Sequence, residues 1–459
     1  MSVELGHPIR NLRDAMETVA VEHALPGVSV SIRRNGCEIF ADSFGACDAD
    51  GLRPVSTDTM FGVASVTKFL TATLIMLARH HKRVKLSDPV SRFYPDLKCA
   101  YDGKICIRHL LSHSGGFPGL PFRHRTTRVE HSNGVAPILT PSALVQGING
   151  LDFEMLGSPG DRLSYSNESY CLLGGIIEDL YHCSYADAAE KLVFQPLQMK
   201  SSSIGASIMR QRPNVAQPLI RIDAALQPCG FWDAPLLDPA GGLSASTRDM
   251  ARLISILAGD TEVLGADAIR DMTAHCLPVA SRPVSGARYG LGLEVTDLDA
   301  HHTLAWHTGQ RPGISSFVGH VMQQRLSVAF ATNVADAPAS TIGHQIIAYM
   351  LKEDLEPGSC VWPPQAKQVK DNQLEWFCGR FGSLEMGEFS IRLDQGRLLL
   401  DMQTAQHKFR FDGPCSGTVG GQTFCFLYDD ETAAVRQPAA ALALDLRVLP
   451  RLGAARRQS

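Results

Sequence analysis

The chain opens with two kinds of apolar pattern. Apolar residues recur every three to four positions over residues 8–24, which predicts an amphipathic helix. Residues 28–32 and 37–41 instead alternate between apolar and polar side chains, and the Asn35-Gly36 pair between them is typical of a tight turn. We therefore expect a helix followed by a β-hairpin at the start of the first domain.

The later part of this domain returns to strand-like patterns. A helical pattern covers about residues 65–79, and a helical, loop-rich stretch follows it to about residue 255. Strand-like segments then come back at residues 291–295, 302–307 and 317–332, before a last helical pattern at residues 340–352. The first domain is thus predicted to begin and end with sheet and to hold a helical middle.

The composition and the apolar pattern of the sequence change near residue 356. Residues 356–368 are rich in proline and polar residues, which is typical of a linker. Short alternating segments follow, at residues 388–393, 397–402, 407–411, 422–428 and 442–448. Their spacing predicts a small β-barrel or sandwich. We therefore expect a first domain of residues 1–355, a linker of residues 356–368 and a barrel domain of residues 369–459.

Charge and hydropathy exclude two classes of protein. Lysine and arginine (43) nearly balance aspartate and glutamate (47), and basic residues form no long stripe, so nucleic-acid binding is not expected. No stretch reaches the ~18 uncharged apolar residues of a membrane span, so no contact with a membrane is expected. The N-terminal residues also lack the basic and apolar regions of a signal peptide. We expect a cytoplasmic protein.

The cysteines and histidines give no metal signature. The twelve cysteines are scattered without a C-x-x-C pair, which suits a reducing compartment. His109 and His113 are spaced like zinc ligands on a helix, but no glutamate base or third ligand stands beside them. We expect no metal ion and no other cofactor.

The first of three short motifs with chemical potential is Ser65-x-x-Lys68, at the start of the long helical pattern. This spacing places a hydroxyl and an amine one helical turn apart on the same face. The start of a helix also offers unpaired N–H groups and the positive end of the dipole, which suits a nucleophile that forms an acyl ester. Alone, the motif is common, and its simpler interpretation is a solvated first turn.

The second motif places Tyr165 and Asn167 two residues apart in a predicted loop. A tyrosine can move a proton when a nearby cation lowers its pKa, and Lys68 would supply that cation. An asparagine amide can bridge a lysine and a substrate amide. The simpler interpretation is an asparagine that caps a turn.

The third motif is His307-Thr308-Gly309, directly after a strand-like segment. Gly309 would let a substrate approach the backbone closely. If this strand lies beside the nucleophile, the backbone N–H of Gln310 could serve as an oxyanion donor. The simpler interpretation is a structural histidine.

Taken together, the three motifs are specific. Their order, and gaps of about 100 and 140 residues, resemble those of the serine β-lactamase/penicillin-binding-protein superfamily, in its class C β-lactamase and D-Ala-D-Ala peptidase branch. The stretches that carry this resemblance are residues 61–72, 109–119, 159–178, 196–205, 238–253, 288–295, 307–317 and 329–333. They span most of residues 15–352.

The resemblance implies a catalytic role for several residues. Ser65 resembles the acylated nucleophile, and Lys68 resembles the general base or the cation that tunes Tyr165. Tyr165 resembles the acid/base that protonates the leaving group and activates the second nucleophile. Asn167 resembles the amide that orients the lysine and the substrate.

The third motif resembles the substrate-binding strand of the superfamily. The backbone N–H groups of Ser65 and Gln310 resemble the oxyanion hole, and Thr308 and Gly309 resemble the substrate-binding residues beside it. His307 stands where many β-lactamases carry lysine, as it does in D-Ala-D-Ala peptidases and D-amino-acid-specific peptidases of the superfamily. A histidine is largely neutral at physiological pH, which argues against a dedicated β-lactamase.

The implied fold class is α+β, with two parts. A two-lobed β-lactamase/transpeptidase-like domain has an antiparallel sheet flanked by helices and a mostly helical lobe, with the site in the cleft between them. A C-terminal lipocalin-like β-barrel would follow, as in D-amino-acid peptidases and penicillin-binding-protein-type thioesterases.

The implied activity is that of a serine acyl-enzyme hydrolase or transferase. It would act on amide, ester or thioester bonds of D-amino-acid-containing peptides or small acyl compounds, free or bound to a carrier protein. One alternative is a stand-alone penicillin-binding-protein-type thioesterase that cyclises nonribosomal peptides. Further alternatives are a β-lactamase-like esterase and a non-catalytic scaffold on the same fold. The sequence predicts no oligomeric state.

Overall fold

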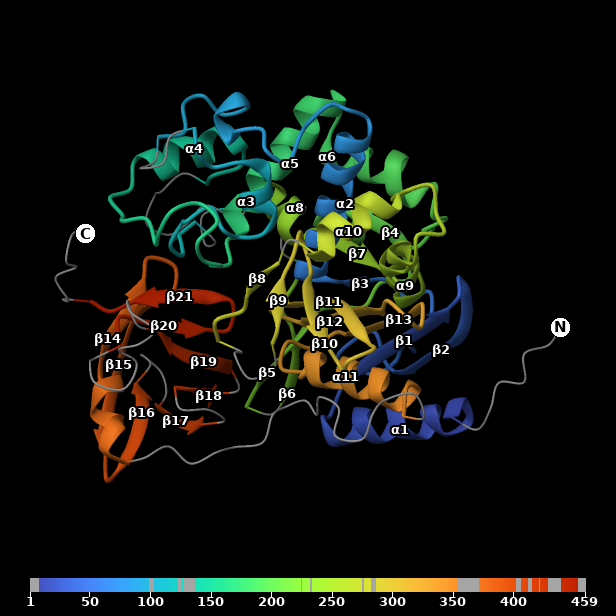
Figure 1. The fold of residues 1–459 in the computed structure, drawn as a ribbon. Coiled ribbons are helices and arrows are strands. Elements are labelled where there is room, and N and C mark those ends of the chain that lie inside the picture. The colour runs from blue at the N-terminus through green and yellow to red at the C-terminus, as the bar shows by residue number, and fades with distance from the viewer. Residues whose placement is uncertain are drawn as a thin grey trace.

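A computed structural model shows an α+β molecule in which a central sheet, a helical lobe and a second curled sheet lie against one another (Figure 1). It describes residues 8–98, 103–122, 126, 137–223, 225–231, 233–274, 276–281, 286–352, 371–401, 406–411, 415–420, 422–427 and 439–452. The predicted linker at residues 356–368 lies outside the described residues.

The central sheet joins the two ends of the first domain. Its eight antiparallel strands have the order β2-β1-β13-β12-β11-β10-β9-β8. Their bounds are β1 Gly27–Arg34, β2 Cys37–Gly45, β8 Leu277–Pro278, β9 Arg288–Tyr289, β10 Glu294–Asp297, β11 Thr303–Arg311, β12 Ile314–Val321 and β13 Leu326–Thr332. Strand β1 pairs with β13, so residues near 30 and near 330 are neighbours, with Val30 opposite Phe330.

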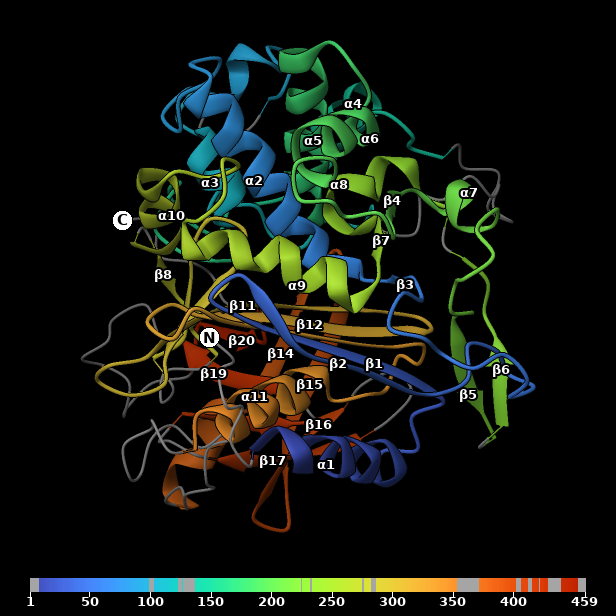
Figure 2. The same cartoon turned by 90° about the vertical axis from the view of Figure 1, so that its right-hand side faces the viewer.

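Helices cover both faces of this sheet, which explains its apolar central strands. Helices α1 (Pro8–Glu22) and α11 (Ala339–Met350) pack on one face, and α9 (Thr247–Ser255) packs on the other (Figure 2). All residues of β12 and β13 are buried, as expected for strands that are covered on both sides. The predicted first helix and hairpin are confirmed, whereas the strand-like pattern at residues 317–332 is two strands joined by a turn.

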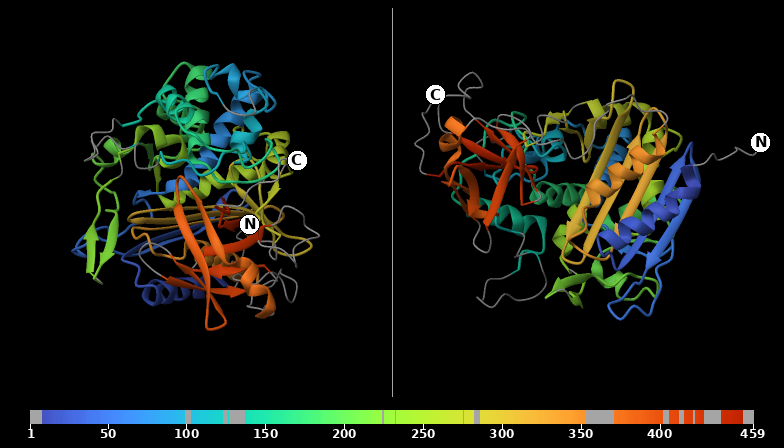
Figure 3. Two further views of the ribbon diagram at one scale, coloured as in Figure 1. Left: turned by 90° about the vertical axis from the view of Figure 1, so that its left-hand side faces the viewer. Right: turned by 90° about the horizontal axis from the view of Figure 1, so that it is seen from below.

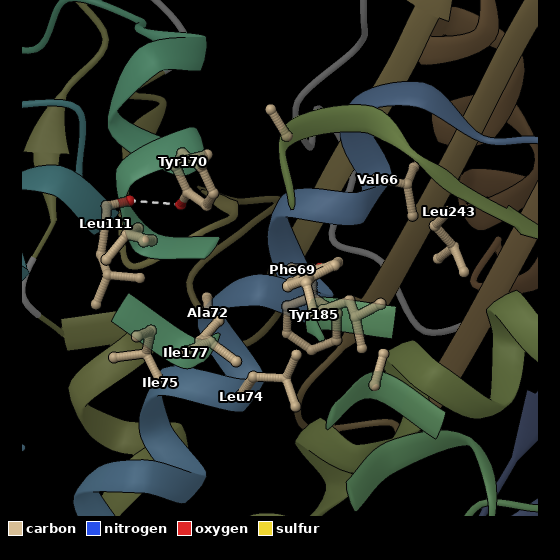
Figure 4. Packing of buried hydrophobic residues seen from close by; sticks show 14 of the residues in the cluster. Val66, Phe69, Ala72, Leu74, Ile75, Leu111, Tyr170, Ile177, Tyr185 and Leu243 are labelled. Carbon is tan, nitrogen blue, oxygen red and sulfur yellow. Dashed lines mark hydrogen bonds between the residues drawn. The ribbon is translucent and has the colours of Figure 1, made fainter. Parts of the chain in front are cut away.

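The helical lobe is built around α2 (Thr67–His80), which follows the short 3₁₀ turn η1 (Ala64–Val66). The other helices of this lobe are α3 Ile107–Leu111, α4 Pro141–Asn149, α5 Asn167–Tyr181, α6 Tyr185–Ala189, α8 Asp238–Gly241 and α10 Ala266–Ala274. Every residue of α2 from Thr67 to Ala78 is buried, and helices α5, α6 and α8 pack against it (Figure 4). Tyr170 on α5 donates a hydrogen bond to the Leu111 carbonyl over 2.7 Å, which ties α5 to α3.

Smaller elements complete the first domain. They are η2 Val90–Arg92, η4 Glu190–Phe194, α7 Ala206–Met209, η5 Pro235–Leu237, η6 Ile256–Ala258, the three-stranded sheet β3 Phe61–Gly62, β7 Leu243–Ala245 and β4 Ser202–Ile204, and the hairpin β5 Leu219–Ile222 and β6 Ala225–Pro228. The β5–β6 hairpin extends along one side of the molecule (Figure 2).

The C-terminal sheet is a nearly closed barrel. After η8 (Asp371–Phe377), its eight strands pair in chain order from β14 to β21 (Figure 3). Their bounds are β14 Gly379–Ser383, β15 Gly387–Asp394, β16 Arg397–Asp401, β17 Gln406–Phe411, β18 Ser416–Val419, β19 Gln422–Leu427, β20 Ala441–Leu444 and β21 Arg447–Pro450. A single bridge between Phe381 and Arg451 links the first strand to the end of the last. The predicted barrel is thus confirmed, but the pattern at residues 442–448 is two strands with a turn between them.

Within the part of the chain that the structure describes, no helix combines the length and apolar character needed to cross a bilayer.

Candidate active site

Ser65 lies at the point where the chain enters the helical lobe. It is the middle residue of η1, and Ala64 before it has a left-handed backbone with φ 46°. A non-glycine residue rarely adopts this conformation, and such strain gathers at functional sites. The Thr67 hydroxyl donates to the Ala64 carbonyl over 2.6 Å and accepts from the Leu243 amide over 3.0 Å. These bonds hold Ser65 at the positive end of α2.

Lys68 follows one turn later and is fully buried. Its Nζ lies 3.2 Å from Ser65 Oγ, 2.8 Å from Asn167 Oδ1 and 2.8 Å from the Ala240 carbonyl. Burial lowers the pKa of Lys68 to about 7. A neutral amine has two hydrogens for the two carbonyl oxygens and one lone pair for the serine hydroxyl. The geometry therefore suits a lysine that accepts the proton of Ser65.

Tyr165 and Asn167 lie beside this amine. Ser166 caps α5, since its hydroxyl accepts from the Ser169 amide over 3.1 Å, and Asn167 is therefore the first residue of the helix. The Lys68 Nζ atom lies over the Tyr165 ring, 4.7 Å from its centre. Burial raises the pKa of Tyr165, and a hydrogen bond with Ser65 opposes this shift. At neutral pH the phenol keeps its proton and can donate it to a leaving group.

The third predicted motif forms an open strand edge beside the serine. Strand β10 covers only residues 303–306 of β11. The following residues, His307, Thr308 and Gln310, line the same cavity as Ser65. Because β12 occupies the other side of β11, an extended substrate could pair with residues 307–311 as a continuation of β10.

His307 is buried and held by two contacts. Its Nδ1 lies 2.5 Å from the Thr308 carbonyl, which can only accept, so Nδ1 carries a hydrogen. Its Nε2 lies 3.1 Å from the Tyr289 hydroxyl. The Gln310 side chain donates to the Ala335 carbonyl, so its backbone is the part available for a substrate.

The glycine at position 309 has a packing role that the sequence does not reveal. A Cβ atom there would lie 1.9 Å from the Val63 carbonyl and 2.6 Å from Ser316 Oγ. Only glycine therefore lets β11 approach the segment that leads into Ser65. The sequence predicted close approach of a substrate at this residue, whereas the structure shows close approach of the chain itself.

These residues surround a cavity of about 630 Å³, within the usual size of a small-molecule site. Its walls come from η1, the loop before α5, β11 and the loop around α8. The barrel supplies another wall, with Met386, Gln422, Asp445, Leu446 and Arg447. All the predicted catalytic residues, Ser65, Lys68, Tyr165, Asn167 and His307, thus meet at one place.

Comparison with known proteins agrees with this geometry. Residues 9–348 match the family model described as Beta-lactamase. The chain belongs to the Beta-lactamase family. The predicted superfamily is therefore confirmed, together with the C-terminal barrel.

Individual relatives are more distant. Penicillin-binding protein 4* of Bacillus subtilis is 30% identical over 195 residues, which are 42% of this chain and 41% of that protein. The chain spans less than two thirds of the length of this relative and of protein flp of Staphylococcus aureus, where the share is 62%.

Two solved structures share the fold. The structure of SurE with D-Leu covers 97% of this chain and 99% of its own, with 22% identity and a TM-score of 0.72. The D-amino acid amidase of Ochrobactrum anthropi SV3, complexed with D-phenylalanine, covers 74% of this chain and 98% of its own, with 22% identity and a TM-score of 0.62. The similarity to SurE extends over nearly the whole of this chain, including the C-terminal barrel. The similarity to the amidase extends over about three quarters of this chain.

The barrel places the ion pair of Arg447 and Glu385 beside Tyr165 of this β-lactamase-like site. The Tyr165 amide donates to the Leu446 carbonyl over 2.8 Å, and the Arg447 guanidinium lies 5.3 Å from the centre of the Tyr165 ring. Arg447 also binds both carboxylate oxygens of Glu385 at 2.9 Å. Sequence analysis missed these residues, because no motif surrounds them and the turn at residues 445–446 was hidden within an alternating pattern.

Two further buried residues support the catalytic loop. His113 Nδ1 accepts from the Ser166 amide over 3.1 Å, and the His113 ring lies 4.2 Å from that of Tyr165. Burial lowers the pKa of His113 well below its usual value, so the ring is neutral. Glu168 accepts from the Ser166 hydroxyl over 3.1 Å, and burial raises its pKa to about 7. Neither residue was predicted to support the site.

The two spaced histidines each accept a hydrogen bond from a nearby backbone amide. His109 Nδ1 accepts from the Cys106 amide and His113 Nδ1 from the Ser166 amide, so both rings serve local structure. Among the residues that the structure describes, no group of three or more His, Cys, Asp or Glu side chains could hold a metal ion.

Proposed function

We propose that this family member is a serine acyl-enzyme hydrolase or acyl transferase with Ser65 as its nucleophile. The observation that carries the proposal is the contact of Ser65 Oγ with a fully buried lysine amine whose remaining partners are two carbonyl oxygens. Burial has lowered the pKa of this lysine to about 7, which is the value a general base needs near neutral pH.

The reaction would proceed in two steps. Lys68 takes the proton of Ser65, whose oxygen attacks a carbonyl held along β11. The N–H groups of Ser65 and Gln310 would stabilise the oxyanion, and the leaving group would depart with a proton from the Tyr165 phenol. The Tyr165 phenolate would then take a proton from the second nucleophile, which attacks the ester carbonyl. Lys68 would return its proton to the Ser65 oxygen as the acyl group leaves.

For the substrate, we propose an amide, ester or thioester with a D-amino acid residue at the scissile carbonyl. One structural neighbour is described as a D-amino acid amidase, and another was solved with D-leucine. The same amidase was also solved with L-phenylalanine, so the test below compares the D- and L-forms of one donor. The cavity also suits a compound larger than one amino acid, since the barrel and the strand edge of β11 line it from different sides.

Water as second nucleophile would make the protein a hydrolase, an amidase, peptidase or esterase. An amine would make it an acyl transferase, and the terminal amine of the same peptide would make it a cyclising thioesterase. The products distinguish these possibilities, because hydrolysis yields a free acid and aminolysis yields an amide or macrocycle. A non-catalytic scaffold would form no adduct at all.

Intact-mass spectrometry with a panel of acyl donors tests the proposal. The donors are a β-lactam, a short activated ester, the D- and L-forms of an aminoacyl amide, and a peptidyl thioester that ends in a D-residue. Wild type and Ser203→Ala, which removes a buried serine outside the cavity, should form an adduct that Ser65→Ala does not. An adduct that persists in Ser65→Ala, or none in the folded wild type with any donor, would contradict it.

A further inference from the structure

The turn between β20 and β21 reaches from the barrel into the catalytic centre. Its Leu446 carbonyl accepts a hydrogen bond from the Tyr165 amide, and the Leu446 side chain packs against the apolar cluster that contains Tyr165 and Tyr289. Other contacts also hold the barrel in this position. Glu385 donates its backbone N–H to the Gly119 carbonyl over 3.0 Å, and Ser281 bonds to Thr423 over 3.1 Å.

Arg447 follows this turn, and its guanidinium stands between a catalytic ring and a carboxylate. It lies over the Tyr165 ring and forms a two-point ion pair with Glu385, and the side chains of the pair are only 20% and 11% exposed. An arginine suits this place because its planar group can stack on an aromatic ring while it binds a carboxylate with two parallel hydrogen bonds. Although burial acts to lower the pKa of Arg447, the bond with Glu385 outweighs it, so the group stays charged.

We propose that Arg447 is a positioning residue of this active site, which holds the Tyr165 ring and supplies positive charge to the catalytic pair of Lys68 and Tyr165, while Glu385 moderates that charge. The proposal rests on the acyl-enzyme function proposed above. It assigns the barrel a part in the chemistry itself.

The surroundings support this assignment. The charged or titratable side chains near Tyr165 come from several elements, namely Lys68 of α2, His113 after α3, Glu168 and Tyr170 of α5, Tyr289 of β9, Glu294 of β10, His307 of β11, Glu385 after β14, and Arg447 with Asp445 around the last turn. The charge of Arg447 lowers the pKa of both Tyr165 and Lys68, and that of Glu385 raises both. The two members of the ion pair thus shift the pKa of Lys68 in opposite directions.

This opposition gives a test that a purely structural ion pair would fail. The pH dependence of the Ser65 acylation rate is measured for wild type, Arg447→Gln and Glu385→Gln. The acid limb of the pH–rate profile, where the rate rises with pH, reports the pKa of the base, Lys68. Arg447→Gln should move this limb to higher pH by about one unit, with a rate about tenfold lower on the limb, whereas Glu385→Gln should move it to lower pH. If the ion pair only stabilised the fold, both variants would lose the same contact, and the acid limb would stay at the wild-type pH.

Two further variants separate charge from geometry. Arg447→Lys keeps the charge but not the planar stack, so its acid limb should match wild type while its maximal rate is lower. Arg451→Gln is the matched control, because this barrel arginine also lies over an aromatic ring, Phe381, at 5.2 Å but does not line the cavity. It should keep the wild-type rate and limb.

Each result decides the proposal. Opposite shifts in the two pair variants support it. Unchanged limbs, shifts in the same direction, or an equal loss in Arg451→Gln would overturn it while Ser65 still forms an adduct in wild type. Absence of any Ser65 adduct in wild type would instead overturn the proposed function, and this proposal with it.

Discussion

Lys68 shows how strongly its surroundings change a single residue. A lysine on a solvated helix would be charged at neutral pH, but here burial lowers the pKa to about 7, and three oxygen atoms direct the amine. The motif Ser65-x-x-Lys68 predicted the two groups on one face of a helix. Its spacing could not predict the burial, which comes from the helices packed around α2.

The first prediction concerns this amine. The acylation rate should rise with pH through about 7, because only the neutral lysine can take the Ser65 proton. Lys68→Met should lower the rate by at least about 100-fold, the usual contribution of a general base. Rapid-quench acylation between pH 5 and pH 9 measures both, with the exposed Lys191→Met as control. A flat profile for wild type would show that another group is the base.

The second prediction concerns Glu168, whose pKa rises from 4.5 to about 7 through burial. A carboxyl group with a raised pKa in the folded state contributes stability below pH 4.5 and loses it as pH rises through about 7. Wild type should therefore lose up to about 3 kcal/mol of unfolding free energy relative to Glu168→Gln between pH 4.5 and pH 8.

Urea unfolding at several pH values measures this difference. The exposed Glu190→Gln variant serves as the control and should follow wild type throughout. Parallel curves for wild type and Glu168→Gln would mean that burial does not raise the pKa of Glu168 in the folded protein.

Among the secondary-structure elements, periodicity predicted those with clear boundaries. The first helix, the β1–β2 hairpin and α11 agree with the sequence, because proline, glycine or an Asn-Gly turn separates them from their neighbours. Two pairs of strands were predicted as single segments. The turn at residues 322–325 contains neither glycine nor proline, and Leu446 in the other turn continues the alternation of its strand.

The third prediction tests the approach of β11 to η1. Gly309→Ala would place a Cβ atom 1.9 Å from the Val63 carbonyl, so the strand must move away from Ser65. We expect a loss of about 1–3 kcal/mol in stability and a clear loss of acylation. Gly265→Ala is the control, since a Cβ there meets no atom within 4 Å. Equal melting temperatures and rates for both variants would show that β11 is not held this closely.

On the scale of the whole molecule, the barrel and the first domain form the active-site cavity together. Gly119 lies where the helical lobe meets the barrel, and a Cβ there would lie 2.9 Å from Ser383 Oγ and 3.0 Å from Glu385. This contact keeps Glu385, and with it Arg447, beside Tyr165. The cavity therefore depends on how the two parts of the chain pack.

The fourth prediction tests the contact of Gly119 with Glu385 by adding a large side chain at position 119. Gly119→Leu should push Glu385 and Arg447 away from Tyr165, so acylation should fall while circular dichroism still shows the native secondary structure. Gly265→Leu, which meets open space, is the control and should keep its activity. Wild-type acylation by Gly119→Leu would show that the barrel does not need this position.

The sequence by itself determined the fold family and predicted the candidate catalytic residues. Ser65, Lys68, Tyr165, Asn167 and His307 stand in short motifs whose order and spacing are specific, and their neighbours in the chain have patterns that predict a helix, a loop and a strand. Local patterns are enough for such features, because periodicity and turn residues depend on neighbours in sequence.

Only the tertiary structure decided how these residues are tuned and what else touches them. The lowered pKa of Lys68, the packing reason for Gly309 and the contact of Arg447 with Tyr165 each involve segments far apart in the chain. Arg447 lies almost 300 residues after Tyr165, and no local pattern relates the two. Burial and charge act through space, so these properties arise only when the barrel and the two lobes are packed together.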